Sequence, residues 1–247
     1  MDNSVIVSLR DIVVEFDGQR ILDGLNLDIH DKEFVTLLGP SGCGKTTTLR
    51  LIAGFLEPNS GKVLLKGENI TGVPPYKRPV NTVFQKYALF PHLNVFENVA
   101  FGLRLKKMDE ETIRRKVRNM LEVVGLKGFE RRSISQMSGG QQQRVAACRA
   151  LVTDPTMIMA DEPTGALDSK SARLLLESLE ALNRRLRATV LMVTHDSFAA
   201  SYTSRVLFIR DGKIFTELRR GDTDRREFFD RIMEVVAMMG GEGSDAL

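Results

Sequence analysis

The sequence predicts an α/β fold in which a mostly parallel sheet is flanked by helices and carries a β-rich N-terminal edge. Three observations support this prediction. Dense apolar runs such as EFVTLLG, TMIMAD and ATVLMVTH suit strands buried on both faces. Segments with helical spacing lie between these runs. The first ~30 residues instead alternate apolar and polar side chains, as antiparallel strands do.

The elements of the N-terminal third follow in order. SVIVSLRDIVVEF and RILDGLNLDI are expected to be antiparallel strands joined by a turn at Asp17-Gly18. EFVTLLG is expected to be a buried strand that leads into a glycine-rich loop, and KTTTLRLIAG a helix that ends at Gly54. SGKVLLKGENI is expected to form a further hairpin-like segment.

Helical spacing dominates from about residue 87 to residue 135, and further helices alternate with strands after it. NVFENVAFGLRL and ETIRRKVRNMLEVVGL are expected helices, and one face of the second carries Ile113, Val117, Met120, Leu121 and Val124. SGGQQQRVAACRALV is expected to be a helix with Ser138 as its N-cap. SKSARLLLESLEALNRRLR is amphipathic, with Leu175, Leu179, Leu182 and Leu186 on one side. RVLFIRDGKIF is expected as a hairpin, and DRREFFDRIMEVVAMM as the last helix.

These elements predict one domain over residues 1–240. Residues 1–86 and 153–240 are expected to form the core with a β subdomain, and residues 87–152 a helical insertion. We expect the tail 241–247 to be frayed, because it is short and rich in glycine.

Composition narrows the class of protein. The chain has 247 residues, 43% of them hydrophobic, which is enough for a sizeable core. The net charge of +3 comes from scattered basic residues, so no nucleic-acid partner is indicated. Two distant cysteines imply no disulfide or metal framework and fit a reducing compartment. No apolar run is long enough to span a bilayer, so membrane contact is expected through a partner alone.

A glycine-rich loop, residues 39–46, has the spacing G-x-x-x-x-G-K-T between the predicted strand and helix. Backbone N–H groups of such a loop converge on an anion and add to the positive end of the helix dipole. Lys45 would reach the β- and γ-phosphates of a nucleotide, and the Thr46 hydroxyl would bind Mg²⁺. The nucleotide-binding residues expected here are Gly39, Pro40, Ser41, Gly42, Cys43, Gly44, Lys45, Thr46 and Thr47.

Two further motifs complete the predicted site. The strand MIMADEP brings Asp161 to its C-terminal end as a magnesium ligand, and Glu162 as the group that accepts a proton from, or orients, water. A second anion site is expected at the signature turn, which comprises Ser138, Gly139, Gly140 and Gln141. One triphosphate does not need two such cradles, so we expect a dimer in which each chain closes on its partner's nucleotide.

The order of GPSGCGKTT, Gln85, MSGGQ, ADEP, GALD and His195 resembles the ATPase subunit of an ABC transporter over almost the whole chain. The resemblance implies the ABC ATPase fold, a P-loop NTPase core with an antiparallel β subdomain and an inserted helical subdomain. It implies hydrolysis of ATP with Mg²⁺, a second copy of the chain and transmembrane permease subunits as partners. It also implies a cytoplasmic location, peripheral on the inner face of the cell membrane.

The same resemblance implies roles for single residues. Phe16 would stack on adenine, and Asp168 would cross the dimer seam. Gln85 would contact Mg²⁺ and water, and His195 the γ-phosphate. The expected catalytic residues are Lys45, Gln85, Glu162 and His195, and the expected metal ligands are Thr46, Gln85 and Asp161.

The transported substrate is less well defined. Residues 37–107 resemble the ATPases of spermidine/putrescine importers, and residues 137–240 those of bacitracin-type peptide-resistance transporters. We expect peptide-resistance or lipid-type export, because that resemblance includes the last helix and the chain stops short of an importer's β-rich regulatory domain. Polyamine import is the alternative, and a chimaeric chain would explain both halves.

Two other functional classes fit the sequence less well. ABC proteins that act on ribosomes or DNA carry two cassettes or a long coiled coil, and this sequence shows neither. A module that binds ATP without turnover is disfavoured by the intact Glu162 and His195.

Overall fold

The computed structural model describes residues 4–84 and 88–241, which divide into two compact units. The first unit comprises Met1–Arg78 and Leu191–Leu247, and the second comprises Pro79–Val190. Residues 242–247, most of the predicted tail, lie outside the described residues. Among the described helices, none is both long and apolar enough to cross a bilayer.

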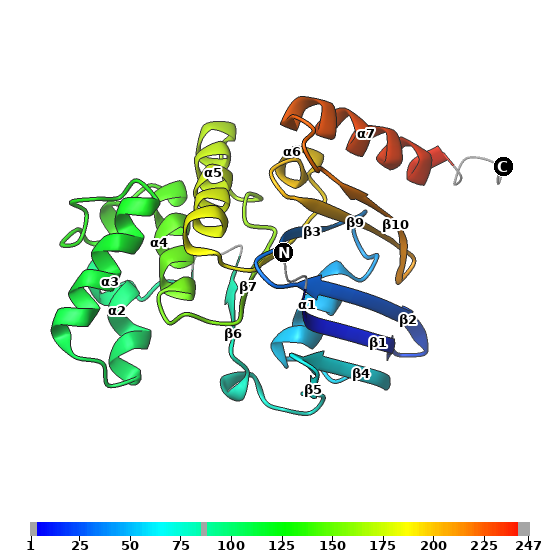
Figure 1. The fold of residues 1–247 in the computed structure, drawn as a ribbon, viewed down its shortest axis with the longest axis horizontal. Coiled ribbons are helices and arrows are strands. Elements are labelled where there is room, and N and C mark those ends of the chain that lie inside the picture. The colour runs from blue at the N-terminus through cyan, green and yellow to red at the C-terminus, as the bar shows by residue number, and fades with distance from the viewer. Residues whose placement is uncertain (1–3, 85–87, 242–247) are drawn as a thin grey trace. The chain divides into compact units, whose positions relative to one another are not determined.

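An antiparallel sheet forms the N-terminal part of the first unit (Figure 1). Its strand order is β2-β1-β4-β5, and each neighbouring pair is antiparallel. The strands are β1 (Val5–Phe16), β2 (Gln19–His30), β4 (Ser60–Leu65) and β5 (Glu68–Asn69). Alternate side chains such as Ile12 and Val14 are buried, so the predicted alternation and the Asp17-Gly18 turn are confirmed.

A second group of strands in the same unit follows the order β10-β9-β3-β8. The strands are β3 (Phe34–Leu38), β8 (Val190–Thr194), β9 (Arg205–Arg210) and β10 (Lys213–Arg219). β3 pairs parallel with β9, and β9 pairs antiparallel with β10. Every residue of β3 is buried, as its unbroken apolar sequence predicts.

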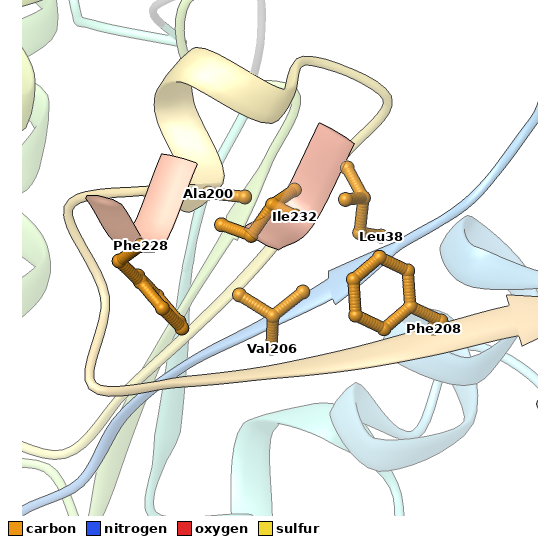
Figure 2. Packing of buried hydrophobic residues seen from close by; sticks show 6 residues of the cluster. All are labelled: Leu38, Ala200, Val206, Phe208, Phe228 and Ile232. Atoms are coloured by element: carbon orange, nitrogen blue, oxygen red, sulfur yellow. The ribbon is translucent and has the colours of Figure 1, made fainter. Parts of the chain in front are cut away.

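Helices cover these strands within the first unit. They are α1 (Lys45–Ala53), α6 (Ser197–Ala200) and α7 (Arg225–Gly241), and a 3₁₀ turn spans Pro75–Lys77. Figure 2 shows α7 contributing Phe228 and Ile232 to a cluster with Ala200 of α6. Leu38, Val206 and Phe208 complete the cluster from β3 and β9. The last helix therefore packs on the strand that leads into the glycine-rich loop.

The second unit is mainly helical. Its elements are β6 (Val80–Val83), α2 (Val95–Leu105), α3 (Glu110–Val123), a 3₁₀ turn (Ile134–Gln136), α4 (Gly139–Leu151), β7 (Met157–Asp161) and α5 (Ser169–Leu186). β6 and β7 pair parallel, and α2, α3 and α4 pack side by side (Figure 1). The predicted face of α3 is buried throughout.

Two details of this unit qualify the expectations. Leu186 is 40% exposed, unlike Leu175, Leu179 and Leu182, because it is the last residue of α5 and lies beyond the packed stretch. Cys148 on α4 is fully buried, and this burial raises the pKa of its thiol to about 12. Both cysteines are free, as the composition predicts.

Candidate active site

The glycine-rich loop connects the buried end of β3 to α1 in the first unit. A Cβ at Gly39 would collide with the carbonyl oxygen of Ile209 and lie 2.8 Å from Cys43 Sγ. Gly44 has a φ of +104°, and a Cβ there would lie 2.5 Å from Leu22 Cδ2. Both positions therefore require glycine for space, and Gly44 requires it for its backbone conformation as well.

Lys45 lies at the centre of this loop. Its side chain is buried, and its Nζ donates to the carbonyl oxygens of Gly39 at 2.8 Å and Pro40 at 2.7 Å. The Lys45 side chain thus reaches back across the loop to its first two residues. A buried cation at the start of a helix favours an anionic ligand.

The start of α1 is also suited to an anion. Gly44 is its N-cap and provides no side-chain cap, and its first turn holds no acidic residue. The first N–H groups of a helix need acceptors from outside the helix, and phosphate oxygens are well suited. Thr46 and Thr47 are half-buried in this turn, whereas Pro40 and Ser41 are exposed.

Cys43 is the residue of this loop with a perturbed ionisation. Burial raises the pKa of its thiol, although the neighbouring Lys45 cation acts in the opposite direction. Its Sγ lies 3.8 Å from Lys45 Nζ. The residue therefore packs as a neutral group inside the loop at pH 7.

Two other predicted residues belong to the first unit. Phe16 ends β1 and is 47% exposed, so it is not a core residue and its ring face can stack on a planar ligand. His195 directly follows β8 and is exposed.

The acidic pair lies in the second unit, at the end of β7. Asp161 is the last residue of that strand, and both Asp161 and Glu162 are half-buried. Glu162 has a φ of +44°, which is uncommon for a residue other than glycine. Such local strain is concentrated at functional sites, and here it falls on the carboxylate predicted to act on water.

The signature turn caps α4 in the second unit. Ser138 Oγ accepts from Gln141 N at 3.3 Å, and Gln141 Oε1 accepts from Ser138 N at 3.0 Å. This reciprocal pair is a capping box, and it confirms the predicted N-cap. A Cβ at Gly140 would lie 2.8 Å from Ser171 Cβ, so α4 and α5 approach closely here.

Asp168 is the N-cap of α5 and accepts from Ser171 N at 3.0 Å. Hydrogen bonds from Ser171 lower the pKa of Asp168 below its usual value, so the carboxyl is ionised at neutral pH. The side chain is exposed at the start of the helix, which leaves it open to contact from another molecule.

Gln85 lies outside the described residues, but the strand leading to it is anchored. Gln143, which is fully buried on α4, donates from Nε2 to the carbonyl oxygen of Phe84 at 3.0 Å. Sequence reasoning missed this residue, whose one available signal was a third consecutive glutamine in SGGQQQ.

Arg78 was missed as well. Its buried guanidinium donates to four backbone carbonyls: those of Leu51, Ile52, Ile70 and Val73, at 2.7–3.0 Å. Two of these carbonyls end α1, so Arg78 caps the helix that begins at the glycine-rich loop.

The residues present fit a magnesium nucleotide. The glycine-rich loop is packed too closely against Ile209 and Leu22 for a Cβ at Gly39 or Gly44, and it holds a buried ammonium group. The Thr46 hydroxyl and the Asp161 carboxylate are oxygen donors of the kind Mg²⁺ prefers.

Comparisons with known proteins agree on the family of this chain. Residues 22–165 match the family model described as ABC transporter. A spermidine/putrescine import ATP-binding protein of Acetivibrio thermocellus is 51% identical over 215 residues, covering 87% of this chain and 61% of that protein. The Clostridioides difficile protein of the same name is 51% identical over 210 residues, covering 85% and 60%. The chain thus spans about three fifths of the length of these relatives.

Solved structures agree on the fold. Dimeric MJ0796, a bacterial ABC transporter cassette, matches with a TM-score of 0.75 at 33% identity, covering 87% of this chain and 98% of that one. The same cassette bound to ADP and Pi gives a TM-score of 0.73. The cbiO1 protein of Clostridium perfringens gives 0.82 at 26% identity, covering 96% and 99%. The expected ABC ATPase fold is confirmed, and the chain belongs to the ABC transporter family.

Proposed function

We propose that this chain is the ATP-binding and ATP-hydrolysing subunit of an ABC transporter. The observation that carries the proposal is Lys45 Nζ, held at 2.7–2.8 Å from two carbonyls inside a loop that has no room for side chains at Gly39 or Gly44. Such a loop accepts the β- and γ-phosphates and offers them a buried positive charge. A related cassette has been solved with ADP and Pi, the products of this reaction.

The residues divide the work by their chemistry. Lys45 and the backbone N–H groups of the loop bind the phosphates, and the exposed ring of Phe16 stacks on adenine. Glu162 accepts the proton of the attacking water or orients it, and His195 and Gln85 contact the γ-phosphate end of the substrate. When bound by Thr46, Gln85 and Asp161, Mg²⁺ supplies charge neutralisation of the phosphates.

A second copy of the chain is part of the proposal. The signature turn caps its own helix and keeps the Ser138 hydroxyl hydrogen available to donate to another molecule's phosphate. Asp168, exposed beside it on α5, would meet the partner across the seam. MJ0796, which has the same fold, was solved as a dimer.

Permease subunits would be the membrane partners, which would place the chain on the inner face of the membrane. On the transported substrate, the comparisons favour the alternative rather than the expected peptide export. The importer ATPases named above are 51% identical over 85–87% of the chain, so the similarity to importers extends well beyond residues 37–107. We therefore propose a polyamine-type importer, and co-purification with polyamine-importer rather than peptide-exporter permeases tests it.

A substitution at Glu162 tests the enzymatic proposal. Glu162→Gln keeps the size of the side chain and removes its ability to accept a proton. We expect ATP turnover to fall by at least about 100-fold while ATP binding persists and an ATP-bound dimer accumulates on size exclusion.

The matched control is Glu177→Gln on α5, whose partly exposed side chain pairs with Arg173 and is not part of the proposed site, so turnover should be unchanged. Equal turnover in the wild type and Glu162→Gln would remove the proposed role of Glu162. A wild type without ATPase activity would contradict the proposal as a whole.

A further inference from the structure

Three hairpin turns of the first unit share one backbone form but differ in what surrounds them. Asp17-Gly18, Lys66-Gly67 and Asp211-Gly212 each place both residues at positive φ, as a type I′ turn requires. A Cβ added at Gly18 or Gly67 would have no atom within 4 Å. At Gly212 it would lie 2.5 Å from the carbonyl oxygen of Ile21 and 2.9 Å from Leu22 Cα. Close packing is therefore particular to Gly212 among these three.

The turn around Gly212 is bonded to two other segments. Gly212 N donates to the carbonyl oxygen of Cys43, within the glycine-rich loop, at 3.3 Å. Asp23 N, near the start of β2, donates to the carbonyl oxygen of Gly212 at 3.3 Å. Lys213 Nζ lies 2.7 Å from Asp23 Oδ2, which ties the following residue of the turn to the same strand.

The start of β2 is also packed against the glycine-rich loop. A Cβ at Gly44 would lie 2.5 Å from Leu22 Cδ2 and 3.1 Å from the carbonyl oxygen of Ile21. Gly212 and Gly44 thus both approach Ile21 and Leu22 as closely as only glycine can. At the other end of the loop, a Cβ on Gly39 would be 3.1 Å from Cγ2 of Ile209, which belongs to the same hairpin.

We propose that the Asp211-Gly212 turn, at the far end of the chain from the loop, positions the glycine-rich loop for ATP, with Gly212 as a positioning residue. The inference rests on the proposed ATP-binding function. Phosphate binding requires the Lys45 ammonium group and the loop amides to be in position at the same time. Small displacements of such groups weaken ligand binding and catalysis strongly. The turn supports the loop through the Cys43 carbonyl and through β2, and a side chain at Gly212 would push on Ile21 and Leu22 of β2.

The test compares two asparagine variants of the full chain. Asparagine tolerates positive φ, so backbone strain should be small in both Gly212→Asn and Gly67→Asn. Of the two new side chains, the one at position 212 alone would collide with neighbouring atoms. We measure binding of a fluorescent ATP analogue, and kcat and KM for MgATP. Gly212→Asn should raise the analogue's Kd and the KM about tenfold, with kcat within about threefold because bound phosphates restore the loop. Gly67→Asn should match the wild type.

The outcomes separate the two proposals. If the wild type binds the analogue and Gly212→Asn binds it equally well, the positioning role is wrong and the ATP-binding function stands. If the wild type does not bind it, both fall.

Should Gly212→Asn not fold, Gly212→Ala and Gly67→Ala replace the pair, with hydrogen exchange of the loop amides at residues 41–46 as the readout. Faster exchange in Gly212→Ala than in Gly67→Ala supports the proposal, and equal exchange overturns it.

Discussion

Two helices of this chain begin at glycine-rich turns, and their first turns are satisfied in different ways. α1 begins at Gly44 in the left-handed conformation, without a side-chain cap. α4 begins at Ser138, whose side chain and that of Gln141 cap the helix reciprocally. Since the first N–H groups of any helix need acceptors, α4 supplies its own and α1 is suited to take them from a ligand. The two turns look alike in sequence, but the signature turn alone of the two is capped by side chains of its own chain.

The opposite end of α1 shows how an uncapped helix start is kept in place. Gly54 ends the helix in the left-handed conformation, and its N–H bonds to the carbonyls of Arg50 and Leu51. Arg78 adds a buried cation on the carbonyls of Leu51 and Ile52. Anchoring at the C-terminal end therefore complements a start designed for an anion.

The largest effect is expected from a substitution in the glycine-rich loop itself. Lys45→Ala removes the buried ammonium that faces the phosphates, so ATP affinity should fall by at least about 100-fold, equivalent to the loss of charge-assisted hydrogen bonds. Titration with a fluorescent ATP analogue measures this. Lys62→Ala, an exposed lysine on β4, is the matched control and should bind normally. Comparable affinity in both variants would contradict the cradle.

The next effect concerns Arg78, which anchors the C-terminal end of α1. Arg78→Lys cannot satisfy four carbonyls with one ammonium group, so the free energy of unfolding should fall by about 2–3 kcal/mol. Urea denaturation followed by circular dichroism measures it. Arg50→Lys, exposed on the same helix, should change stability little. If both variants unfold at the same urea concentration, Arg78 is not the anchor.

A pair of substitutions sharpens the comparison at the signature turn. Ser138→Ala loses the cap and should cost about 1 kcal/mol of stability as well as ATP-dependent dimerisation. Ser138→Asp keeps a capping oxygen, so its stability should stay close to that of the wild type, but its negative charge would repel a phosphate. Thermal unfolding and size exclusion with ATP separate the two effects. An ATP-bound dimer of Ser138→Asp would refute the role of this turn in binding nucleotide.

The smallest effect is the slow reactivity of Cys43. Burial raises the pKa of its thiol, so only a small fraction is thiolate at pH 8. That fraction increases when the pH is raised above the usual thiol pKa. Labelling by N-ethylmaleimide should therefore be slower than for a free cysteine peptide and should accelerate with pH. ATP should protect the residue, and the modified chain should bind ATP poorly. Cys148, with a pKa of about 12 and full burial, should stay unlabelled and serves as the internal reference. Normal ATP binding after modification of Cys43 would count against this loop as the ATP-binding site.

Local patterns accounted for most of the fold. The Asp17-Gly18 and Asp211-Gly212 hairpins, the buried run of β3, the Gly54 terminus of α1 and the Ser138 cap all follow from neighbouring residues, because turn and cap chemistry acts over a few positions. The short strand β6 and the single-turn helix α6 were not predicted, since neither is long enough to show a period. The preference for peptide export depends on the resemblance of residues 137–240 and on the chain length, and relatives matched over most of the chain favour polyamine import instead.

By itself, the sequence determined the family, the glycine-rich loop with Lys45, the acids at the end of β7 and the signature turn, because each is a contiguous motif whose chemistry is local. The tertiary structure alone decided which distant residues support these motifs. Arg78 lies 26 and 27 positions from the α1 carbonyls it caps, and Gln143 lies 59 positions from the carbonyl it holds. Gly212 contacts Cys43 from the other end of the chain. Such contacts leave no periodic trace in the sequence, because they depend on how folded segments meet rather than on the spacing between residues.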